Sequence, residues 1–132
     1  MKILYAMSDI LNIAGTYDTP TIKFDPNEGT FAMSGRSLPA NTFDFYAPML
    51  DAVLDYLKNP LEFSKFDFKM DFINSSSTKV IQELFYRIEQ VHKKGAKVIV
   101  NWYYKFGDED LKELGDDLRM DITFPFEFIA YE

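Results

Sequence analysis

The sequence predicts an α/β fold, in which a mixed β-sheet carries an N-terminal antiparallel hairpin and about three helices pack against it. Residues 65–72 alternate charged and apolar side chains, which is typical of a strand with one buried face. An amphipathic helix follows directly, with apolar residues at helical spacing from Val80 to Val91. Strand–helix–strand pieces of this kind imply parallel strands joined by right-handed crossovers.

The N-terminal part predicts a short strand at residues 10–14 and then a hairpin of strands 21–24 and 30–35. Residues 25–29 between these strands are typical of a turn, because Pro26 presets φ and Gly29 accepts positive φ. Residues 36–41 are predicted to form a loop that leads into a helix capped by Asn41 or Thr42.

The first helix is expected to end at Asn59-Pro60, and its apolar residues fall at helical spacing: Phe45, Met49, Val53, Leu54 and Leu57. In the strand that follows, the alternation predicts one buried face, made by Phe66, Phe68, Met70 and Phe72. In the second helix, Glu89 falls among the polar residues of the opposite, exposed side.

The C-terminal part predicts a strand, a helix and a final strand. The strand at residues 97–104 looks buried on both faces in its first half. Acidic residues at 108–110 favour a helix N-terminus there, and Leu111, Leu114 and Leu118 follow. The last strand is expected at residues 124–129, where Pro125 favours an edge position.

Composition limits the classes of function. At 132 residues the chain is expected to form one domain over residues 1–132. A net charge of −7 without a basic run argues against nucleic-acid binding. No apolar stretch reaches the roughly 20 residues of a membrane span, and Ser8 interrupts the apolar start too early for a secretory signal, so a cytoplasmic protein is expected. No cysteine and one histidine argue against a metal site, and no glycine-rich loop indicates a cofactor.

A run of small polar residues, Asn74, Ser75, Ser76 and Ser77, separates the long strand from the second helix. One interpretation is a capped helix with spare serines, since such side chains accept hydrogen bonds from the first helical turn. The other is a phosphorylation site, where a phosphate would meet free N–H groups and the positive end of the helix. The pattern leaves all three serines open as the acceptor.

Two other patterns give competing hypotheses. Arg36 could bind a carboxylate or phosphate bidentately, and if its loop lies at the same end of the sheet as the serines, Arg36, Ser37 and Asn41 could form a partner or anion contact in a ligand-binding module. Ser76 and Lys79 match the S-x-x-K pattern of serine acyl enzymes. The companion motifs of those enzymes are absent, so catalysis is the least favoured of these hypotheses.

Several motifs occur in one order along nearly the whole chain and together resemble the SiaC family of bacterial regulatory phosphoproteins. They are Thr19-Pro20, Phe24-Asp25-Pro26, the loop Gly35-Arg36-Ser37-Leu38-Pro39-Ala40-Asn41, Phe45-Tyr46, the turn Asn74-Ser75-Ser76-Ser77, Trp102-Tyr103-Tyr104 and Phe124-Pro125-Phe126. The resemblance implies a fold similar to the STAS domains of anti-sigma-factor antagonists, and a role that is not enzymatic.

The resemblance also implies partner switching. A protein kinase would phosphorylate the residue after the asparagine of the turn, here Ser75, and a PP2C-type phosphatase would remove the phosphate. The unmodified protein would bind a target such as a diguanylate cyclase and so affect biofilm formation. This chain has serine where the family often has threonine, and Ala40 stands where a glutamate commonly follows the proline.

Overall fold

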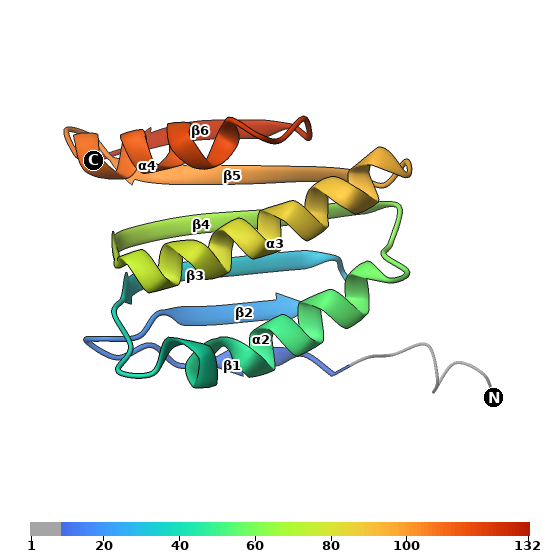
Figure 1. The fold of residues 1–132 in the computed structure, drawn as a ribbon, viewed down its shortest axis with the longest axis horizontal. Coiled ribbons are helices and arrows are strands. Elements are labelled where there is room, and N and C mark those ends of the chain that lie inside the picture. The colour runs from blue at the N-terminus through green and yellow to red at the C-terminus, as the bar shows by residue number, and fades with distance from the viewer. Residues whose placement is uncertain (1–8) are drawn as a thin grey trace.

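The computed structural model describes residues 9–132, so the expectation about the apolar start at residues 1–7 lies outside the described residues. The described strands form one sheet in the order β1-β2-β3-β4-β5-β6. The strands are β1 (Leu11–Ile13), β2 (Thr21–Asp25), β3 (Thr30–Ser37), β4 (Phe63–Ile73), β5 (Lys97–Lys105) and β6 (Phe126–Tyr131). The helices are α2 (Thr42–Leu57), α3 (Ser75–Lys93) and α4 (Glu109–Arg119). All three helices cover the same face of the sheet (Figure 1).

The sheet is mixed, as predicted. Strands β1, β2 and β3 pair antiparallel, whereas β3, β4, β5 and β6 pair parallel. Each helix connects two neighbouring parallel strands, so the ends of β3, β4 and β5 and the starts of α2, α3 and α4 meet at one edge of the sheet (Figure 1).

The core lies between the sheet and the helix layer and is rich in aromatic rings. The ring of Phe68 in β4 lies 5.4 Å from Phe85 of α3 and 5.8 Å from Trp102 of β5, measured between centroids. No helix formed by residues 9–132 lies over the opposite face of the sheet, so the alternating polar residues of β4 point there. On this open face, Asp67 accepts a hydrogen bond from Asn101 at 2.8 Å and lies 3.7 Å from the Lys65 ammonium.

The prediction that Phe72 is buried was wrong: its side chain is 43% exposed. Gly35 pairs with Met70 but Arg36 pairs with Phe72, so Asp71 is an extra residue in β4, a β-bulge. The bulge reverses the alternation, so Phe72 turns to the open face and Ile73 packs on the core instead. Simple alternation assumes an unbroken ladder and therefore gives the wrong side after the bulge.

The prediction that Glu89 is exposed was also wrong: the residue is only 6% exposed. Its carboxylate accepts hydrogen bonds from Thr123 N and Thr123 Oγ1, both at 2.8 Å, and from Phe124 N at 3.3 Å. The segment between α4 and β6 covers this side of α3. The side is therefore buried although its residues in the sequence are polar.

Several element boundaries differ from the predictions by one to three residues, and the differences at β3 and β6 matter most. Strand β3 continues through Arg36 and Ser37, which were expected in a loop, because both residues pair with β4. The last strand begins at Phe126, so Pro125 precedes it rather than interrupting it. Strand β6 is nevertheless an edge strand, as predicted.

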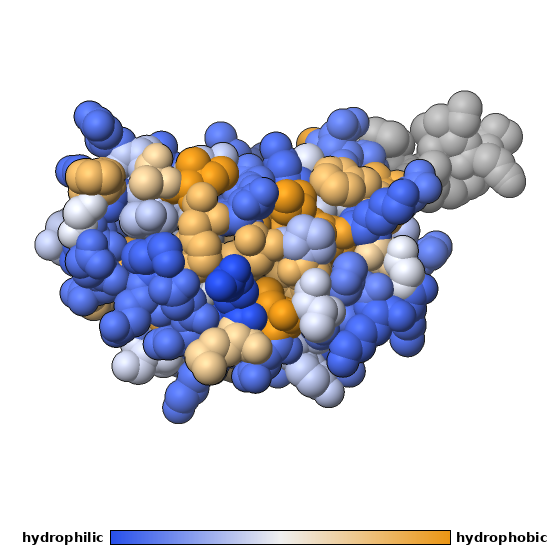
Figure 2. Space-filling view, turned by 90° about the horizontal axis from the view of Figure 1, so that it is seen from above, coloured by the Kyte–Doolittle hydropathy of each residue, from blue (hydrophilic) through white to orange (hydrophobic). Residues whose placement is uncertain are grey.

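Strand β6 carries apolar side chains, and the basic side chains of α4 lie over one of them, Phe128. Figure 2 looks onto this side of the molecule, where apolar residues lie among hydrophilic ones across the middle of the surface. Lys112 Nζ lies 4.0 Å and Arg119 Cζ 5.4 Å from the centre of the Phe128 ring. Charges over an edge strand discourage pairing with another chain. No helix in residues 9–132 has the length and apolar character needed to cross a membrane.

Candidate functional site

The junction of β4 and α3 is fixed by Asn74, which caps the helix. Asn74 N donates to Ser37 O of β3 at 2.9 Å, and Asn74 Oδ1 accepts from Ser77 N at 2.9 Å. Thr78 Oγ1 donates to Asn74 O at 3.0 Å. The asparagine therefore joins the first turn of α3 to the end of β3 and determines where each serine points.

Ser77 is fully buried between β3, α2 and α3. Its Oγ accepts a hydrogen bond from Ser37 Oγ at 2.7 Å, and Ser37 Oγ lies 2.5 Å from the Tyr46 hydroxyl. Burial raises the pKa of Tyr46, although the hydrogen bonds with Ser37 and Ser77 act in the opposite direction. The Ser77 hydroxyl therefore holds three elements together and is out of reach of another protein.

Ser76 is exposed but already paired. Its Oγ lies 2.7 Å from Thr42 Oγ1 at the start of α2 and donates to Asn74 Oδ1 at 3.3 Å. These partners tie the N-termini of α2 and α3 together at the surface. Within residues 9–132 no hydrogen bond joins Ser76 to Lys79, so the activated serine–lysine pair of an acyl enzyme is not formed.

Ser75 is the first residue of α3 and is exposed. Its hydroxyl makes no hydrogen bond to any residue between 9 and 132. The first N–H groups of a helix lack intrahelical acceptors and carry the positive end of the helix dipole. Of the three serines, Ser75 is therefore the one whose hydroxyl is free to be modified and whose surroundings suit an anion.

The structure does not bring Arg36, Ser37 and Asn41 together as one contact. Arg36 lies on the open face, where Nε donates to Tyr17 O at 3.1 Å and Cζ stacks 4.5 Å from the Tyr17 ring centre. Asn41 is exposed and caps α2 by accepting from Asp44 N at 3.2 Å. Ser37 points the other way, into the core, so its expected contact with a partner or anion is not available. The hypothesis that this loop and the serines share one end of the sheet is confirmed by the bond from Asn74 N to Ser37 O.

Sequence reasoning missed the part that α2 plays in this site. Thr42 is predicted only as a helix cap, and Tyr46 enters only as part of a family motif and not of the buried stripe, although it lies three residues before Met49 on the same buried side of the helix. Phe43, between them in the chain, is 74% exposed. The signal available was the helical spacing itself, because Tyr46 continues the buried series Met49, Val53 and Leu57. Among residues 9–132, acidic and histidine side chains form no group of three that could hold a metal ion.

Comparison with known proteins gives consistent results. A family model described as SiaC family regulatory phosphoprotein matches residues 13–131. An uncharacterized protein of Pseudomonas aeruginosa strain UCBPP-PA14 is 32% identical over 126 residues, which cover 96% of this chain and 99% of that protein.

Two solved structures extend the comparison to the fold. SiaC of Pseudomonas aeruginosa superposes with a TM-score of 0.86 at 29% identity, covering 94% of this chain and 100% of that one. SiaC in complex with the diguanylate cyclase SiaD, of which it is the activator, gives a TM-score of 0.87 at 30% identity, covering 92% and 99%. The family match spans nearly all of the described sheet and helices. The chain therefore belongs to the SiaC family of regulatory phosphoproteins.

Proposed function

We propose that this chain is a non-catalytic, cytoplasmic regulator that works by partner switching at Ser75. A protein kinase phosphorylates Ser75 and a PP2C-type phosphatase restores the free hydroxyl. The unmodified form binds and regulates a target such as a diguanylate cyclase. The observation that carries the proposal is the exposed Ser75 hydroxyl at the start of α3, which has no hydrogen-bond partner among residues 9–132, beside two serines that are held by other residues. The complex of the related SiaC with the cyclase SiaD supports the class of target.

The proposed switch is local. A phosphate adds about 1.5 to 2 negative charges, and at Ser75 it would lie near N–H groups that α3 leaves free, so the fold tolerates it. A partner that covers Ser75 would instead have to strip water from this group and accommodate its bulk. The modification therefore weakens binding without unfolding the protein.

The test starts with intact-mass and phosphopeptide analysis of the protein from its own host, where we expect phosphate on Ser75. Ser75→Ala is expected to stay folded and bind purified diguanylate cyclases of that host like the unmodified protein, whereas Ser75→Asp is expected to bind several-fold more weakly in calorimetry. Asn59→Asp, an added charge on an exposed residue near the end of α2, is the matched control and is expected to bind normally.

Two results would contradict the proposal. Phosphate found only on Ser76 would place the switch on the neighbouring hydroxyl. Equal cyclase binding by wild type, Ser75→Asp and chemically phosphorylated protein would show that Ser75 does not control the partner.

A further inference from the structure

Three side chains on the open face of the sheet form a stack, which we call the stacked cluster: Tyr17, Arg36 and Phe72. The guanidinium of Arg36 lies against both rings, with Cζ 4.5 Å from the centre of the Tyr17 ring and 5.5 Å from the centre of the Phe72 ring. Arg36 Nε donates to Tyr17 O at 3.1 Å and so fixes the loop to β3. The proposed switch at Ser75 uses none of these three side chains.

Both rings of the stacked cluster face solvent, and the backbone holds each of them there. Tyr17 is 75% exposed and precedes Asp18, whose carbonyl oxygen accepts from Leu38 N at 2.8 Å. Phe72 is 43% exposed because the bulge at Asp71 turns it to the open face. Exposed aromatic rings that are already held in place are the anchors that protein partners bury at low entropic cost.

Arg36 adds a positive charge that this chain leaves unpaired. Within residues 9–132 no acidic side chain pairs with Arg36, and its two terminal nitrogens make no hydrogen bond to those residues, although the chain has a net charge of −7. The rings cover the faces of the guanidinium plane and leave its outer edge free to bind a carboxylate with two parallel hydrogen bonds. The stacked cluster therefore fits a partner that presents an acidic side chain beside apolar surface.

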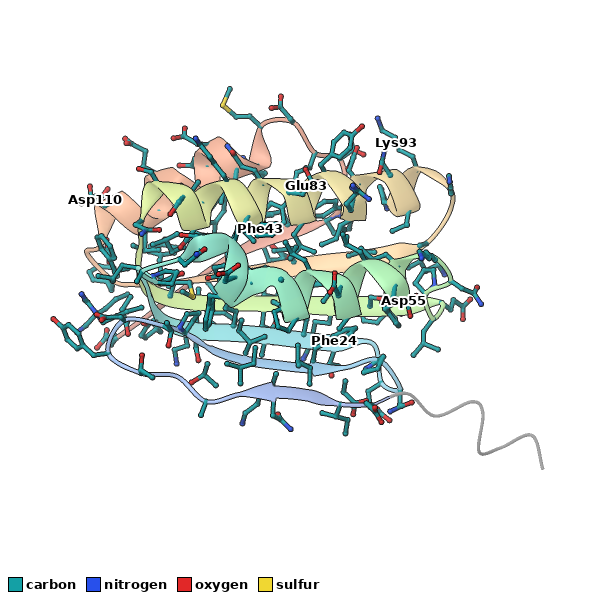
Figure 3. All side chains as sticks on the ribbon, turned by 60° about the horizontal axis from the view of Figure 1, so that its bottom comes forward. Phe24, Phe43, Asp55, Glu83, Lys93 and Asp110 are labelled. Carbon is teal, nitrogen blue, oxygen red and sulfur yellow. The ribbon has the colours of Figure 1, made fainter. Side chains whose placement is uncertain are left out.

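The helix layer offers the opposite charge. Acidic residues outnumber basic ones in the three helices. Figure 3 shows Asp55, Glu83 and Asp110 projecting from α2, α3 and α4 into solvent. Like charges facing each other across an interface are costly. An acidic partner surface is therefore favoured on the open face, at Arg36, and disfavoured over the helices.

The stacked cluster lies close to Ser75, around the edge of the sheet. Phe72 precedes Ser75 by three residues, so their Cα atoms lie within about 11 Å of each other. Arg36 precedes Ser37, whose carbonyl oxygen accepts from Asn74 N at 2.9 Å. An interface of standard size buries about 800 Å² on each partner, the area of a disc about 16 Å in radius. One protein can therefore act on Ser75 and cover the stacked cluster in the same contact.

Ser75 by itself gives a kinase little to bind. Its side chain is a small neutral hydroxyl, and its backbone belongs to the first turn of α3. Asn74 holds that turn by accepting from Ser77 N and by donating to Ser37 O, both at 2.9 Å, so placing the segment in an extended conformation would break these bonds. A phosphatase instead meets a phosphate, which forms strong charge-assisted hydrogen bonds. Of the two enzymes, the kinase is the one that needs a second anchor.

We propose that the stacked cluster of Tyr17, Arg36 and Phe72 is the docking surface by which the protein kinase recognises this folded chain and reaches Ser75. It rests on the proposed function, which makes Ser75 the acceptor. An acidic side chain of the kinase binds the free edge of Arg36, and apolar side chains cover the two rings. These contacts are remote from the reacting hydroxyl and are equal before and during phosphoryl transfer, so they lower KM and leave kcat unchanged.

The first experiment measures the kinetics of Ser75 phosphorylation. The kinase is purified from the host of this protein by following ATP-dependent incorporation of phosphate at Ser75. KM and kcat are then measured with each folded variant as the substrate. Phe72→Ala and Arg36→Ala are each expected to raise KM about tenfold and to leave kcat within about twofold of wild type. A loss confined to kcat would contradict a docking role.

Phe63→Ala is the matched control for Phe72→Ala. Phe63 lies on the same strand and is 54% exposed, against 43% for Phe72. It stands nine residues, or about 30 Å, farther from Ser75 along the strand. Its KM is expected to stay within about twofold of wild type. An equal rise in KM for Phe63→Ala, or a wild-type KM for both Phe72→Ala and Arg36→Ala, would overturn the docking surface.

Arg36→Lys tests the contact with the least change to the fold. It keeps a long, positively charged side chain but lacks the planar group that stacks and binds a carboxylate at two points. We expect its KM to rise at least threefold, and circular dichroism of each variant checks the fold. A wild-type KM for Arg36→Lys would overturn the bidentate contact on which the docking surface depends.

The reverse reaction tests the assignment to the kinase. Each variant is phosphorylated to completion and then treated with the phosphatase purified from the same host by its release of this phosphate. Dephosphorylation of Phe72→Ala and Arg36→Ala is expected within about twofold of wild type, because the phosphate itself anchors that enzyme. Equal losses in phosphorylation and dephosphorylation would overturn the assignment of the stacked cluster to the kinase.

These measurements also separate this proposal from the proposed function. If Ser75 is phosphorylated and the variants of the stacked cluster behave like wild type, the switch stands and the docking surface fails. If a host extract supplied with ATP adds no phosphate to Ser75 of the wild-type protein, both proposals fail.

Discussion

Glu89 illustrates how one buried charge fastens a connection between two elements of the fold. Burial alone would raise the pKa of this carboxyl group, but hydrogen bonds from Thr123 and Phe124, and the nearby Lys93, lower the pKa below the ordinary 4.5. Charge-assisted hydrogen bonds to backbone N–H groups favour the ionised form. Ionised Glu89 therefore fastens the segment before β6 to α3.

We expect stability to fall in acid through Glu89. Because its pKa is lower in the folded than in the unfolded state, its stabilisation is fully present above pH 4.5 and is lost as pH falls through the folded-state pKa. Glu89→Gln is expected to be less stable near neutral pH by roughly 1–3 kcal/mol and to lose less stability on acidification. Urea unfolding at about pH 7 and about pH 3 measures both effects.

The matched control is Glu83→Gln on the same helix. Glu83 forms an exposed ion pair with Arg87 at 2.8 Å, and exposed pairs are worth at most about 1 kcal/mol. Glu83→Gln is therefore expected to follow the wild-type pH profile. A wild-type pH profile for Glu89→Gln as well would show that the buried carboxylate does not contribute as described.

Helix α4 lies close to the sheet because Gly115 permits it. A Cβ atom at this position would lie 2.6 Å from Phe128 Cε1 and 2.8 Å from both Trp102 Cδ1 and Nε1. Trp102 Nε1 donates to Leu111 O in the same helix at 2.9 Å, so the indole cannot move away without losing that bond. The glycine thus sets the distance between α4 and β5.

Gly115→Ala is expected to destabilise the protein, although alanine is the better helix former by about 1 kcal/mol. Overpacking against rings costs about 1–3 kcal/mol and outweighs that gain here. Urea unfolding followed by the fluorescence of the single tryptophan measures the change. Glu113→Ala, on the exposed side of α4, is the control and is expected to remain near wild type. A stabilised Gly115→Ala would mean that α4 shifts without cost.

The helices and strands of this fold were predictable because each is encoded by neighbouring residues. Which side chains of an element are buried was less predictable, because burial depends on distant parts of the chain. Alternation predicted β4 and helical spacing predicted α3. Each pattern can be read from residues that are close together in the sequence. The burial of Glu89 depends on a segment more than thirty residues later, and the turn of Phe72 depends on a bulge paired with β3. For the same reason the pattern left three serines equivalent, since only the contacts of Ser77 with Ser37 and of Ser76 with Thr42 distinguish them.

The layered architecture makes stability uneven across the sheet. Strand β4 pairs on both sides and lies under α3, whereas β1 has three residues and pairs only with β2. Opening a central strand requires breaking two ladders and exposing the aromatic core, while an edge strand opens alone. The serine run lies at the well-held end of this range, because α3 begins directly after the central strand β4 ends.

Native-state hydrogen exchange is expected to follow this order. Amides of β4 and β5 should exchange most slowly and those of β1 most rapidly. Strand β6 should lie between them, because it pairs on one side only but has six residues where β1 has three. Mass spectrometry or NMR of the unmodified protein measures the rates. Equal protection of β1 and β4 would contradict the view that the core lies under α3 and α4.

The bulge in β4 changes which face of the sheet every later residue of the strand occupies. Up to Met70 the strand keeps one frame, and after Asp71 every side chain moves to the other face, so that Ile73 enters the core and Asn74 reaches Ser37. The register after the bulge therefore determines which hydroxyl of the serine run is exposed to solvent and which is buried. A chain with the same four residues after its strand, but without the inserted residue, would expose a different hydroxyl of the serine run.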